Sequence, residues 1–316
     1  MSSALAADLR RLGLDPREDE PLARHGYWRI GGPADLWVEV GTRAQLGGLL
    51  RLGTPVTVVG NGSNLLVSDR GVRGVALRLT GELKESQFID GPEGPEGDEV
   101  RVVAGAGLLN AVLLKRLEAR QLGGLAPLAG VPGTVGGAIR LNAGTALGEI
   151  GDHTIEVEYF DINGILQTLH HDDLRFSYRH AAVPRGAVLT QATLRARRSG
   201  VAEEAAAITH HLSRRKATQP LELPSCGSVF KNPPGDFAGR LIEGCGLKGR
   251  RQGDAMISDK HANFIVNLGS ARAEDVLFLI HLAMETVLAE RGVRLEPEVH
   301  VVGDWQSPPF GPRTHL

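Results

Sequence analysis

The hydrophobic positions of this 316-residue chain recur with helical spacing in some segments and form short runs in others. Helical spacing predicts helices at residues 3–13, 43–52, 108–121, 203–215 and 273–291. Short apolar runs predict strands at residues 34–40, 55–59, 65–67, 74–79, 100–104, 155–160, 165–170, 187–196 and 299–302. The last helix is expected to stop at Gly292.

Polar and glycine-rich segments separate these elements. Residues 161–164 (Asp-Ile-Asn-Gly) predict a hairpin turn between two strands, because Asn-Gly favours the backbone conformation that such turns require. Residues 91–98 are rich in Pro and Gly, and we interpret them as a surface loop or a joint between subdomains. Residues 217–224 end a helix and are interpreted as the passage into another domain. At roughly 100–200 residues per domain, the length predicts two or three domains.

Residues 129–144 (AGVPGTVGGAIRLNAG) contain five glycines and one charge, on Arg140. A flexible linker of this glycine content would be polar, whereas this run alternates glycine with apolar residues. That pattern suits backbone that must pack tightly and lie against a flat or anionic group. Thr134 is placed to cap a short helix from Val135, and we expect free backbone N–H groups at its start to suit a phosphate.

A second run, at residues 58–67 (VVGNGSNLLV), predicts a strand, a tight polar turn and another strand. Two turns of this kind favour a large phosphorylated ligand over a protein that is merely glycine-rich. Neither run has the glycine spacing of a Rossmann dinucleotide fingerprint or of a P-loop. If a dinucleotide binds, another fold must bind it.

Composition argues against several classes of function. The formal net charge of −2 gives no electrostatic reason to expect nucleic-acid or membrane binding. No apolar run reaches the ~18 residues of a membrane span. Cys226 and Cys245 are too few for a disulfide framework and have no zinc partners at ligand spacing. Neighbouring histidines at 170–171 and 210–211 point apart in regular structure, so we predict no metal. We expect a soluble, cytoplasmic protein.

Polar segments at residues 176–179, 225–233 and 295–299 contain side chains suited to chemistry. Ser228 follows a glycine, so it is either a turn residue or a hydroxyl held in one direction. Arg179, taken alone, is interpreted as an ordinary surface arginine. Glu298 lies in a strand pattern and faces either solvent or a cleft. Local sequence leaves these alternatives open.

Seven motifs follow one another along the chain: 29–35 (RIGGPAD), 60–64 (GNGSN), 132–138 (PGTVGGA), 142–144 (NAG), 177–179 (SYR), 227–233 (GSVFKNP) and 260–267 (KHANFIVN). Each is weak alone, but the ordered set is specific. From about residue 24 to about residue 303, the chain resembles the UDP-N-acetylenolpyruvoylglucosamine reductases (MurB) of peptidoglycan synthesis. It would be the short form of that family, because no tyrosine that could cover the substrate lies between Arg179 and Ser228.

The resemblance implies an α+β protein with a vanillyl-alcohol-oxidase-like (PCMH-type) FAD-binding domain of two subdomains and a C-terminal α/β substrate-binding domain. The implied ranges are 1–85 and 86–200 for the two FAD subdomains, 201–303 for the substrate-binding domain and 304–316 for a tail. The implied reaction reduces UDP-N-acetylglucosamine enolpyruvate to UDP-N-acetylmuramate, with non-covalent FAD and with NADPH as hydride donor. The expected partner is therefore a UDP-sugar.

Carried over residue by residue, the resemblance assigns three roles. Ser228 matches the proton donor, and Arg179 and Glu298 match the residues that stabilise the enolate intermediate. The substrate contacts would be Tyr178, Lys231 and Asn232. The FAD contacts would be Gly60, Asn61, Gly62, Ser63, Asn64, Pro132, Gly133, Thr134, Gly136, Gly137, Asn142, Ala143 and Gly144.

These residue types suit the implied chemistry. An arginine fork donates two hydrogen bonds to a carboxylate. A serine is a weak acid, so its hydroxyl must be steered by a neighbour and must meet a strong carbon base. Cys226 is interpreted as structural, because it lies two residues from the motif serine. One departure from the resemblance is Asp254, in Gly-Asp-Ala, where the family usually has Gly-Gly-Ala.

Two rival hypotheses compete with this interpretation. An oxidase of hydroxy acids or sugars on the same FAD fold would lack Ser228, Arg179 and Glu298 as a set. A catalytically idle scaffold that binds FAD or a UDP-sugar is disfavoured because all three are present. The flavin absorbance after NADPH, and then after substrate without oxygen, distinguishes the three hypotheses.

Overall fold

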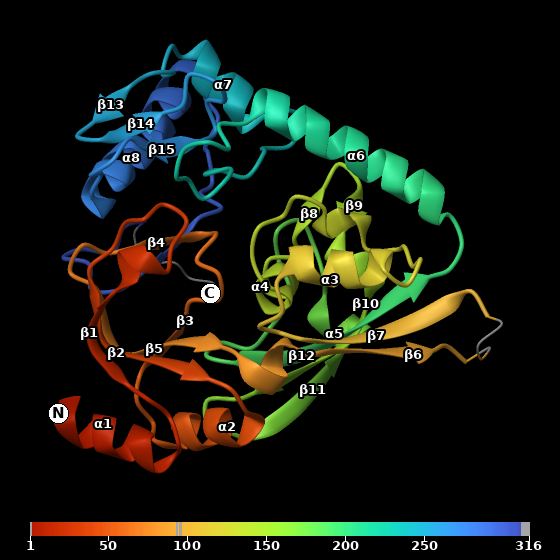
Figure 1. Cartoon of the computed structure of the whole chain (residues 1–316). Helices are drawn as coiled ribbons and strands as arrows, with labels where there is room; N and C mark the ends of the chain where they lie inside the picture. The colour runs from red at the N-terminus through yellow and green to blue at the C-terminus, as the bar shows by residue number, and fades with distance from the viewer. Residues whose placement is uncertain (1, 93, 95–96, 311–316) are drawn as a thin grey trace. The chain divides into compact units, whose positions relative to one another are not determined.

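The computed structural model describes residues 2–92, 94 and 97–310 (Figure 1). The chain forms two compact units, and each unit is made of three segments. Unit 1 consists of Met1–Pro16, Val38–Asn61 and Leu77–Arg214. Unit 2 consists of Arg17–Trp37, Gly62–Ala76 and Arg215–Leu316.

The described α-helices are α1 (Ser2–Arg11), α2 (Arg43–Arg51), α3 (Asn110–Glu118), α4 (Val135–Arg140), α5 (His171–Leu174), α6 (Val201–Thr218), α7 (Ala238–Gly244) and α8 (Ala273–Arg291). Short 3-10 helices are η1 (Leu22–Arg24), η2 (Gly81–Lys84), η3 (Ala126–Leu128) and η4 (Ile150–His153). The described strands are β1 (Arg17–Pro21), β2 (Pro33–Val40), β3 (Val56–Val58), β4 (Leu65–Val67), β5 (Val72–Leu79), β6 (Ser86–Asp90), β7 (Glu99–Gly105), β8 (Gly144–Thr145), β9 (Gly148–Glu149), β10 (Thr154–Phe160), β11 (Leu166–His170), β12 (Val188–Arg197), β13 (Arg251–Gln252), β14 (Ala255–Ile257), β15 (Ile265–Asn267) and β16 (His300–Val302).

Unit 1 is built on an antiparallel sheet with the strand order β11-β10-β12-β7-β6. Helix α4 packs on β12 and β7, and α3 lies on the same side of the sheet (Figure 1). The predicted hairpin is confirmed, because β10 and β11 pair and Asp161 Oδ1 accepts hydrogen bonds from the amides of Asn163 and Ile165. The sheet thus supports the helix that begins inside the first glycine run.

Unit 2 has a core that joins segments far apart in the sequence. Trp28 is buried in one core cluster with residues of β14 and β15 and donates from Nε1 to the carbonyl of Ile265 at 2.7 Å. Strand β16 pairs in parallel with β4. Helix α8 begins where the carboxylate of Asp69 accepts from the amides of Ala273 and Glu274, and it ends at Gly292 as predicted.

Most predicted elements are confirmed, with boundaries that differ by a few residues. The helix predicted at 108–121 is shorter, Asn110–Glu118, because Leu108 O accepts from the amide of Val135 and Leu109 forms a β-bridge with Thr134. The pattern did not predict β1, whose sequence is REDEP. In that strand only Glu20 is buried, where its carboxylate meets His25 Nε2 at 2.8 Å.

Compact units and domains divide a chain differently, so the four predicted domain ranges stay predictions. Residues 93, 95–96 and 311–316, which fall in the predicted loop and the predicted tail, lie outside the described residues. None of the helices in the described part of the chain is long and apolar enough to cross a membrane.

Asp254 occupies a two-residue hairpin turn between β13 and β14, in which Gln252 pairs with Ala255. Gly253 has a φ of +53°, whereas Asp254 has no positive φ. A turn of this kind requires glycine only at its first central position. The carboxylate of Asp254 accepts from the amide of Ser270 at 2.9 Å. The acidic residue is therefore compatible with the turn and braces a neighbouring loop.

We predict that Asp254→Gly lowers the free energy of unfolding by about 1 kcal/mol, because it removes this hydrogen bond and gives the unfolded chain more freedom. Urea unfolding measures the change. Asp254→Asn keeps an acceptor oxygen and should lose less than half as much. Equal stability of Asp254→Gly and the parent would contradict this account.

Candidate active site

The two glycine runs meet inside unit 1. A Cβ atom built on Gly60 would lie 3.5 Å from Thr134 Oγ1, so the start of the GNGSN turn lies against the N-cap of α4. Arg78 Nε donates to the carbonyl of Gly60 at 2.9 Å and fixes the start of that turn. Segments 74 residues apart in sequence are therefore in contact at this point.

The cap predicted at Thr134 is confirmed, but the free amides predicted after it are not present. Thr134 Oγ1 accepts from the amide of Gly137 at 3.3 Å. The amide of Val135 donates to Leu108 O at 2.8 Å, and that of Gly136 donates to Ala106 O at 2.9 Å. The run is pressed against residues 106–108, and buried amides there bond to the nearest carbonyls. The expectation of a phosphate site on free N–H groups at this helix start is therefore wrong.

Gly136 shows what the glycines of this run do. A Cβ atom at Gly136 would lie 2.9 Å from the Cβ of Ala106, which is closer than real side chains approach. Glycine at this position permits close packing of α4 on the preceding segment. The tight packing expected from the alternation of glycine with apolar residues is thus confirmed at Gly136.

In unit 2 the second part of the GNGSN turn contacts the segment that contains Glu298. Asn64 Nδ2 donates to the carbonyl of Glu298 at 3.1 Å, and Asn64 O accepts from the amide of His300 at 3.0 Å. Gly62 has a φ of +63°, and a Cβ atom there would lie 2.2 Å from the carbonyl oxygen of His25. The structure thus places a predicted FAD residue, Asn64, beside a predicted catalytic residue.

Asn142 joins the first glycine run to the SYR motif. Its buried Nδ2 donates to Ser177 O at 3.0 Å and to the carboxylate of Glu149 at 2.6 Å. Its Oδ1 accepts from the amide of Gly151 at 2.9 Å. Because these bonds occupy both donor hydrogens, Asn142 is better suited to shaping the site than to contacting FAD. Its predicted FAD contact stays a prediction.

Arg179 lies at the end of the same run. Ser177 and His180 exchange two backbone hydrogen bonds, so Tyr178 and Arg179 form the tip of a tight turn. Arg179 donates from a terminal nitrogen to Gly144 O at 3.2 Å, and its guanidinium lies 5.2 Å from the ring centroid of Tyr178. Within unit 1 the structure therefore brings a predicted catalytic residue to the predicted FAD run.

Ser228 and Glu298 lie on paired backbones in unit 2. Val229, the residue after Ser228, accepts from the amide of Glu298 at 2.8 Å, and Phe230 forms a β-bridge with Pro297. Both Ser228 and Glu298 are half-buried. The structure thus brings together two predicted catalytic residues that are 70 positions apart in sequence.

Asn263 supports the segment that follows Ser228, and it was absent from the predicted site. It is buried, and its side chain accepts from the amide of Phe230 at 2.9 Å and donates to the carbonyl of Phe230 at 2.8 Å. Its backbone carbonyl also accepts from the amide of Val229. The signal that could have identified it is its position in the KHANFIVN motif at residues 260–267.

The predicted substrate residues continue the same segment. Lys231 Nζ donates to the carboxylate of Glu296 at 2.6 Å, and its amide donates to Glu296 O. Asn232 Oδ1 accepts from the amide of Ala238 at the start of α7. Among the described residues, no group of three or more His, Cys, Asp or Glu side chains could hold a metal ion.

Cys226 is a core residue. It is buried in the cluster that contains Trp28, and its Sγ lies 3.6 Å from Leu65 O. Burial raises the pKa of its thiol to about 12. Its burial in the core agrees with the structural role expected from the sequence.

Comparison with known proteins identifies the family. A curated UDP-N-acetylenolpyruvoylglucosamine reductase 2 from Symbiobacterium thermophilum is 45% identical over 98% of this chain and 100% of its own length. This chain belongs to the UDP-N-acetylenolpyruvoylglucosamine reductase family. A second such reductase, from Moorella thermoacetica, is 43% identical over 96% of this chain and 98% of its own length.

Family models and a solved structure agree with this membership. Residues 35–170 match an FAD binding domain, and residues 219–302 match the C-terminal domain of the reductase family. The crystal structure of the Thermus caldophilus reductase (MurB) is 38% identical and has a TM-score of 0.77, covering 92% of this chain and 98% of that one. The α+β fold with a PCMH-type FAD-binding domain and a C-terminal reductase domain is therefore as expected from the sequence.

The cysteine assignment gives a prediction about thiol reactivity. At pH 8 the native protein should react with iodoacetamide at Cys245, which is partly exposed, and not at Cys226. With a pKa of about 12, only about one Cys226 thiol in 10⁴ is ionised at that pH, and the thiolate is the nucleophile. Mass spectrometry of tryptic peptides measures the labelling, and protein unfolded in urea, in which both residues should react, is the control. Labelling of native Cys226 as fast as Cys245 would disprove its burial.

Proposed function

We propose that this protein catalyses the NADPH-dependent, FAD-mediated reduction of UDP-N-acetylglucosamine enolpyruvate to UDP-N-acetylmuramate for peptidoglycan precursor synthesis. Its membership of the reductase family and its FAD binding domain support the proposal. The structural observation that carries it is the hydrogen bond of Arg179 to Gly144 O at the end of the glycine run, because an arginine there suits a substrate carboxylate. The proposal includes a cytoplasmic location and no nucleic-acid partner.

The residues of the glycine runs fit a bound FAD. Asn110 is buried beside the first run, where its amide bonds to Gly133 O and its Nδ2 to Val131 O. Its Oδ1 has no hydrogen-bond partner among the described residues. A buried acceptor without a donor costs roughly 1–3 kcal/mol, and a hydroxyl or amine of a nucleotide is the kind of group that would supply the donor. Residues 60–64 and 132–144 would hold this cofactor.

FAD, when bound, would accept hydride from NADPH and deliver it to the substrate. The protein must then bind the substrate carboxylate and stabilise the negative charge that hydride addition creates beside it. Arg179 is suited to this task, because the planar fork of an arginine donates two parallel hydrogen bonds to a carboxylate. Tyr178, 46% exposed at the tip of the same turn, is proposed to contact the substrate.

Ser228 is proposed to deliver a proton to the carbon next to the site of hydride addition. Its hydroxyl is a poor acid, so the transfer needs the strongly basic enolate carbon and a fixed direction. Asn263 holds the backbone of Phe230, two residues after Ser228, and so helps to fix the segment from which the hydroxyl extends. Glu298 would stabilise the enolate from the neighbouring backbone, and Lys231 and Asn232 would contact the UDP-sugar.

This proposal explains features that the two rivals leave unexplained. A hydroxy-acid or sugar oxidase has no need for the paired backbones of Ser228 and Glu298 in unit 2. An inactive scaffold has no need for Arg179 in a left-handed backbone conformation, with a φ of +56°. Such a conformation costs of order 1–3 kcal/mol and is concentrated at functional sites.

The first test is the cofactor. The purified protein should be yellow, with roughly one FAD per chain and no covalent link, because neither glycine run contains a His or Cys for attachment. Absorbance of the native protein, and of the supernatant after acid precipitation, measures the stoichiometry and the linkage. A colourless protein that takes up no FAD on reconstitution would contradict the proposal.

The second test separates hydride transfer from proton transfer. Ser228→Ala should leave flavin bleaching by NADPH near its normal rate, because that step delivers no proton to substrate carbon. Reoxidation by the enolpyruvyl sugar, followed anaerobically by stopped-flow absorbance, should slow by at least ~10², the low end for loss of a positioned general acid.

Cys226→Ala is the matched control for Ser228→Ala and should leave reoxidation unchanged, because its thiol is in the core. Slow reoxidation in Cys226→Ala with normal reoxidation in Ser228→Ala would show that the proton donor is misassigned. Normal reoxidation in both variants would place the proton source elsewhere.

A further inference from the structure

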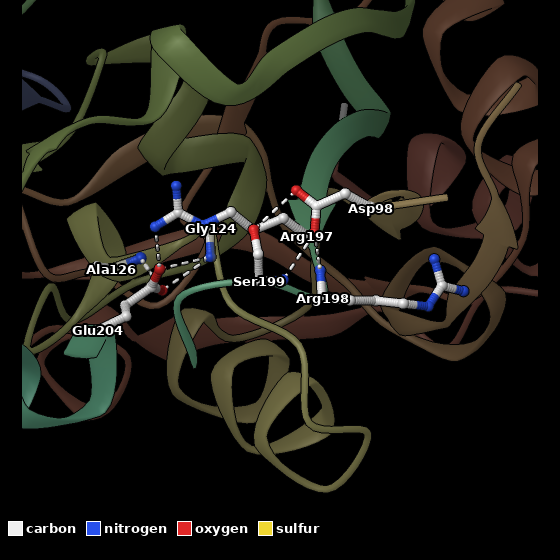
Figure 2. Close-up of polar contacts among 7 residues, drawn as sticks. All are labelled: Asp98, Gly124, Ala126, Arg197, Arg198, Ser199 and Glu204. Atoms are coloured by element: carbon white, nitrogen blue, oxygen red, sulfur yellow. Dashed lines mark hydrogen bonds and ion pairs between the residues drawn. The ribbon is translucent and has the colours of Figure 1, made fainter. Parts of the chain in front are cut away.

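A buried carboxylate from the first turn of α6 holds the loop that leads into the first glycine run (Figure 2). The loop, residues 122–129, is buried at every position. Glu204 reaches it from 75 residues or more farther along the chain, and its side chain is only 10% exposed. The sequence pattern predicts no role for this glutamate.

The contacts of Glu204 are mainly with backbone amides. Gly124 N donates to both carboxylate oxygens, at 2.9 Å to Oε1 and 2.7 Å to Oε2, and Ala126 N donates to Oε1 at 3.1 Å. Arg197 donates to Oε2 at 3.2 Å and balances the charge. A Cβ atom at Gly123 would lie 2.9 Å from Oε2, so glycine there leaves room for the carboxylate.

A carboxylate suits this position better than a neutral side chain. Ionised acceptors make hydrogen bonds that are shorter and about twice as strong as neutral pairs. The two amides and the guanidinium are all donors, and a carboxylate presents only acceptor oxygens. A glutamine would keep one acceptor and turn an NH₂ group toward one of these donors.

The loop that Glu204 holds leads to the site through packed elements of unit 1. Ala126 begins η3, and η3 packs on β8 and β9. A Cβ atom at Gly148, in β9, would lie 3.3 Å from Cγ of Pro127. Gly144, in β8, is the residue whose carbonyl accepts from Arg179. Glu204 is therefore connected to the glycine run through the chain and to Arg179 through the β8–β9 pair.

We propose that Glu204 is a positioning residue of the reductase, which sets the first glycine run and the carbonyl that holds Arg179 by fixing the amides of Gly124 and Ala126. The inference rests on the proposed function, because the run is the proposed FAD site. Loss of the carboxylate should weaken FAD binding without any direct contact between Glu204 and the cofactor.

Asp98 provides a matched control in the same region (Figure 2). Its carboxylate accepts from Ser199 N at 2.7 Å, Ser199 Oγ at 2.8 Å and Arg198 N at 3.1 Å, and these hydrogen bonds lower the pKa of Asp98. Like Glu204, Asp98 ties the start of α6 to another segment by bonds to backbone amides, which for Asp98 are those of the two residues at 198–199 just before the helix. Unlike Glu204, it makes these bonds outside the loop at residues 122–129.

The experiment measures FAD affinity and amide protection in the full-length protein. Apoprotein of the parent, Glu204→Gln, Arg197→Gln and Asp98→Asn is titrated with FAD by flavin fluorescence, and hydrogen exchange is followed in each apoprotein. Glu204→Gln should weaken FAD binding about tenfold, equivalent to about 1.4 kcal/mol. It should also speed exchange in peptides covering Gly124 and Ala126.

The control variants should behave differently. Arg197→Gln should weaken binding less than threefold, because the amide bonds to Glu204 remain. Asp98→Asn should leave the FAD dissociation constant within twofold of the parent, even if its melting temperature falls as much as that of Glu204→Gln. If Glu204→Gln does not fold, Glu204→Asp is measured instead; it keeps the charge but is one methylene too short to reach both amides, and the same weakening is expected.

Three results would overturn the inference. Unchanged FAD affinity in Glu204→Gln, with faster exchange at Gly124 and Ala126, would show that the loop does not set the FAD site. Equal weakening in Asp98→Asn would show that FAD binding responds to any loosening of the start of α6. A parent protein that binds no FAD would overturn the proposed function and this inference with it, whereas the first two results leave the proposed function intact.

Discussion

Buried main-chain amides and carbonyls need hydrogen-bond partners, and this requirement governs how the loops of this protein are built. Where no strand or helix supplies the partner, a buried side chain does. Asn263 bonds to both backbone groups of Phe230, and Asp69 bonds to the first two amides of α8. Because a buried unpaired group costs roughly 1–3 kcal/mol, such side chains determine which loop conformations are stable.

The same requirement explains the glycine run. Its amides at Val135 and Gly136 are buried against residues 106–108, and their bonds to those carbonyls leave them unable to bind an anion. Close packing requires glycine, and it also brings the backbone amides within hydrogen-bond distance of protein carbonyls, so these amides are no longer available to a ligand. A glycine-rich helix start is therefore an anion site only when it faces open space, a condition that composition cannot show. Here the run contributes a closely packed backbone and its own Thr134, and Asn110 lies beside it.

Regular elements with strong periodicity could be predicted from the sequence, and so could the family. Helix α8 and the β10–β11 hairpin have local signals that agree with their tertiary surroundings. Strand β1 could not be predicted, because four of its five residues face solvent and its hydrogen bonds come from pairing with β2. Pairing between distant segments leaves no trace in local periodicity.

The candidate site shows the same limit. Motif order identified Ser228, Arg179 and Glu298 as candidates. Local sequence alone also allowed a purely structural or solvent-exposed role for each of them. What the structure adds is their setting: Glu298 pairs with Val229, and Arg179 bonds to Gly144. Glu204 could not be found in this way, because one glutamate on a polar helix looks like any solvated residue until its distant amide partners are known.

The backbone of Arg179 shows how such bonds can hold a conformation that the residue itself disfavours. A φ of +56° is uncommon for any residue with a side chain and costs of order 1–3 kcal/mol. Two backbone bonds between Ser177 and His180 close the turn around it. Asn142 then holds Ser177 O, and Gly144 O holds the guanidinium, so both restraints come from the glycine run. The strain is therefore borne by the segment proposed to hold FAD, which couples the direction of the arginine to the position of the cofactor site.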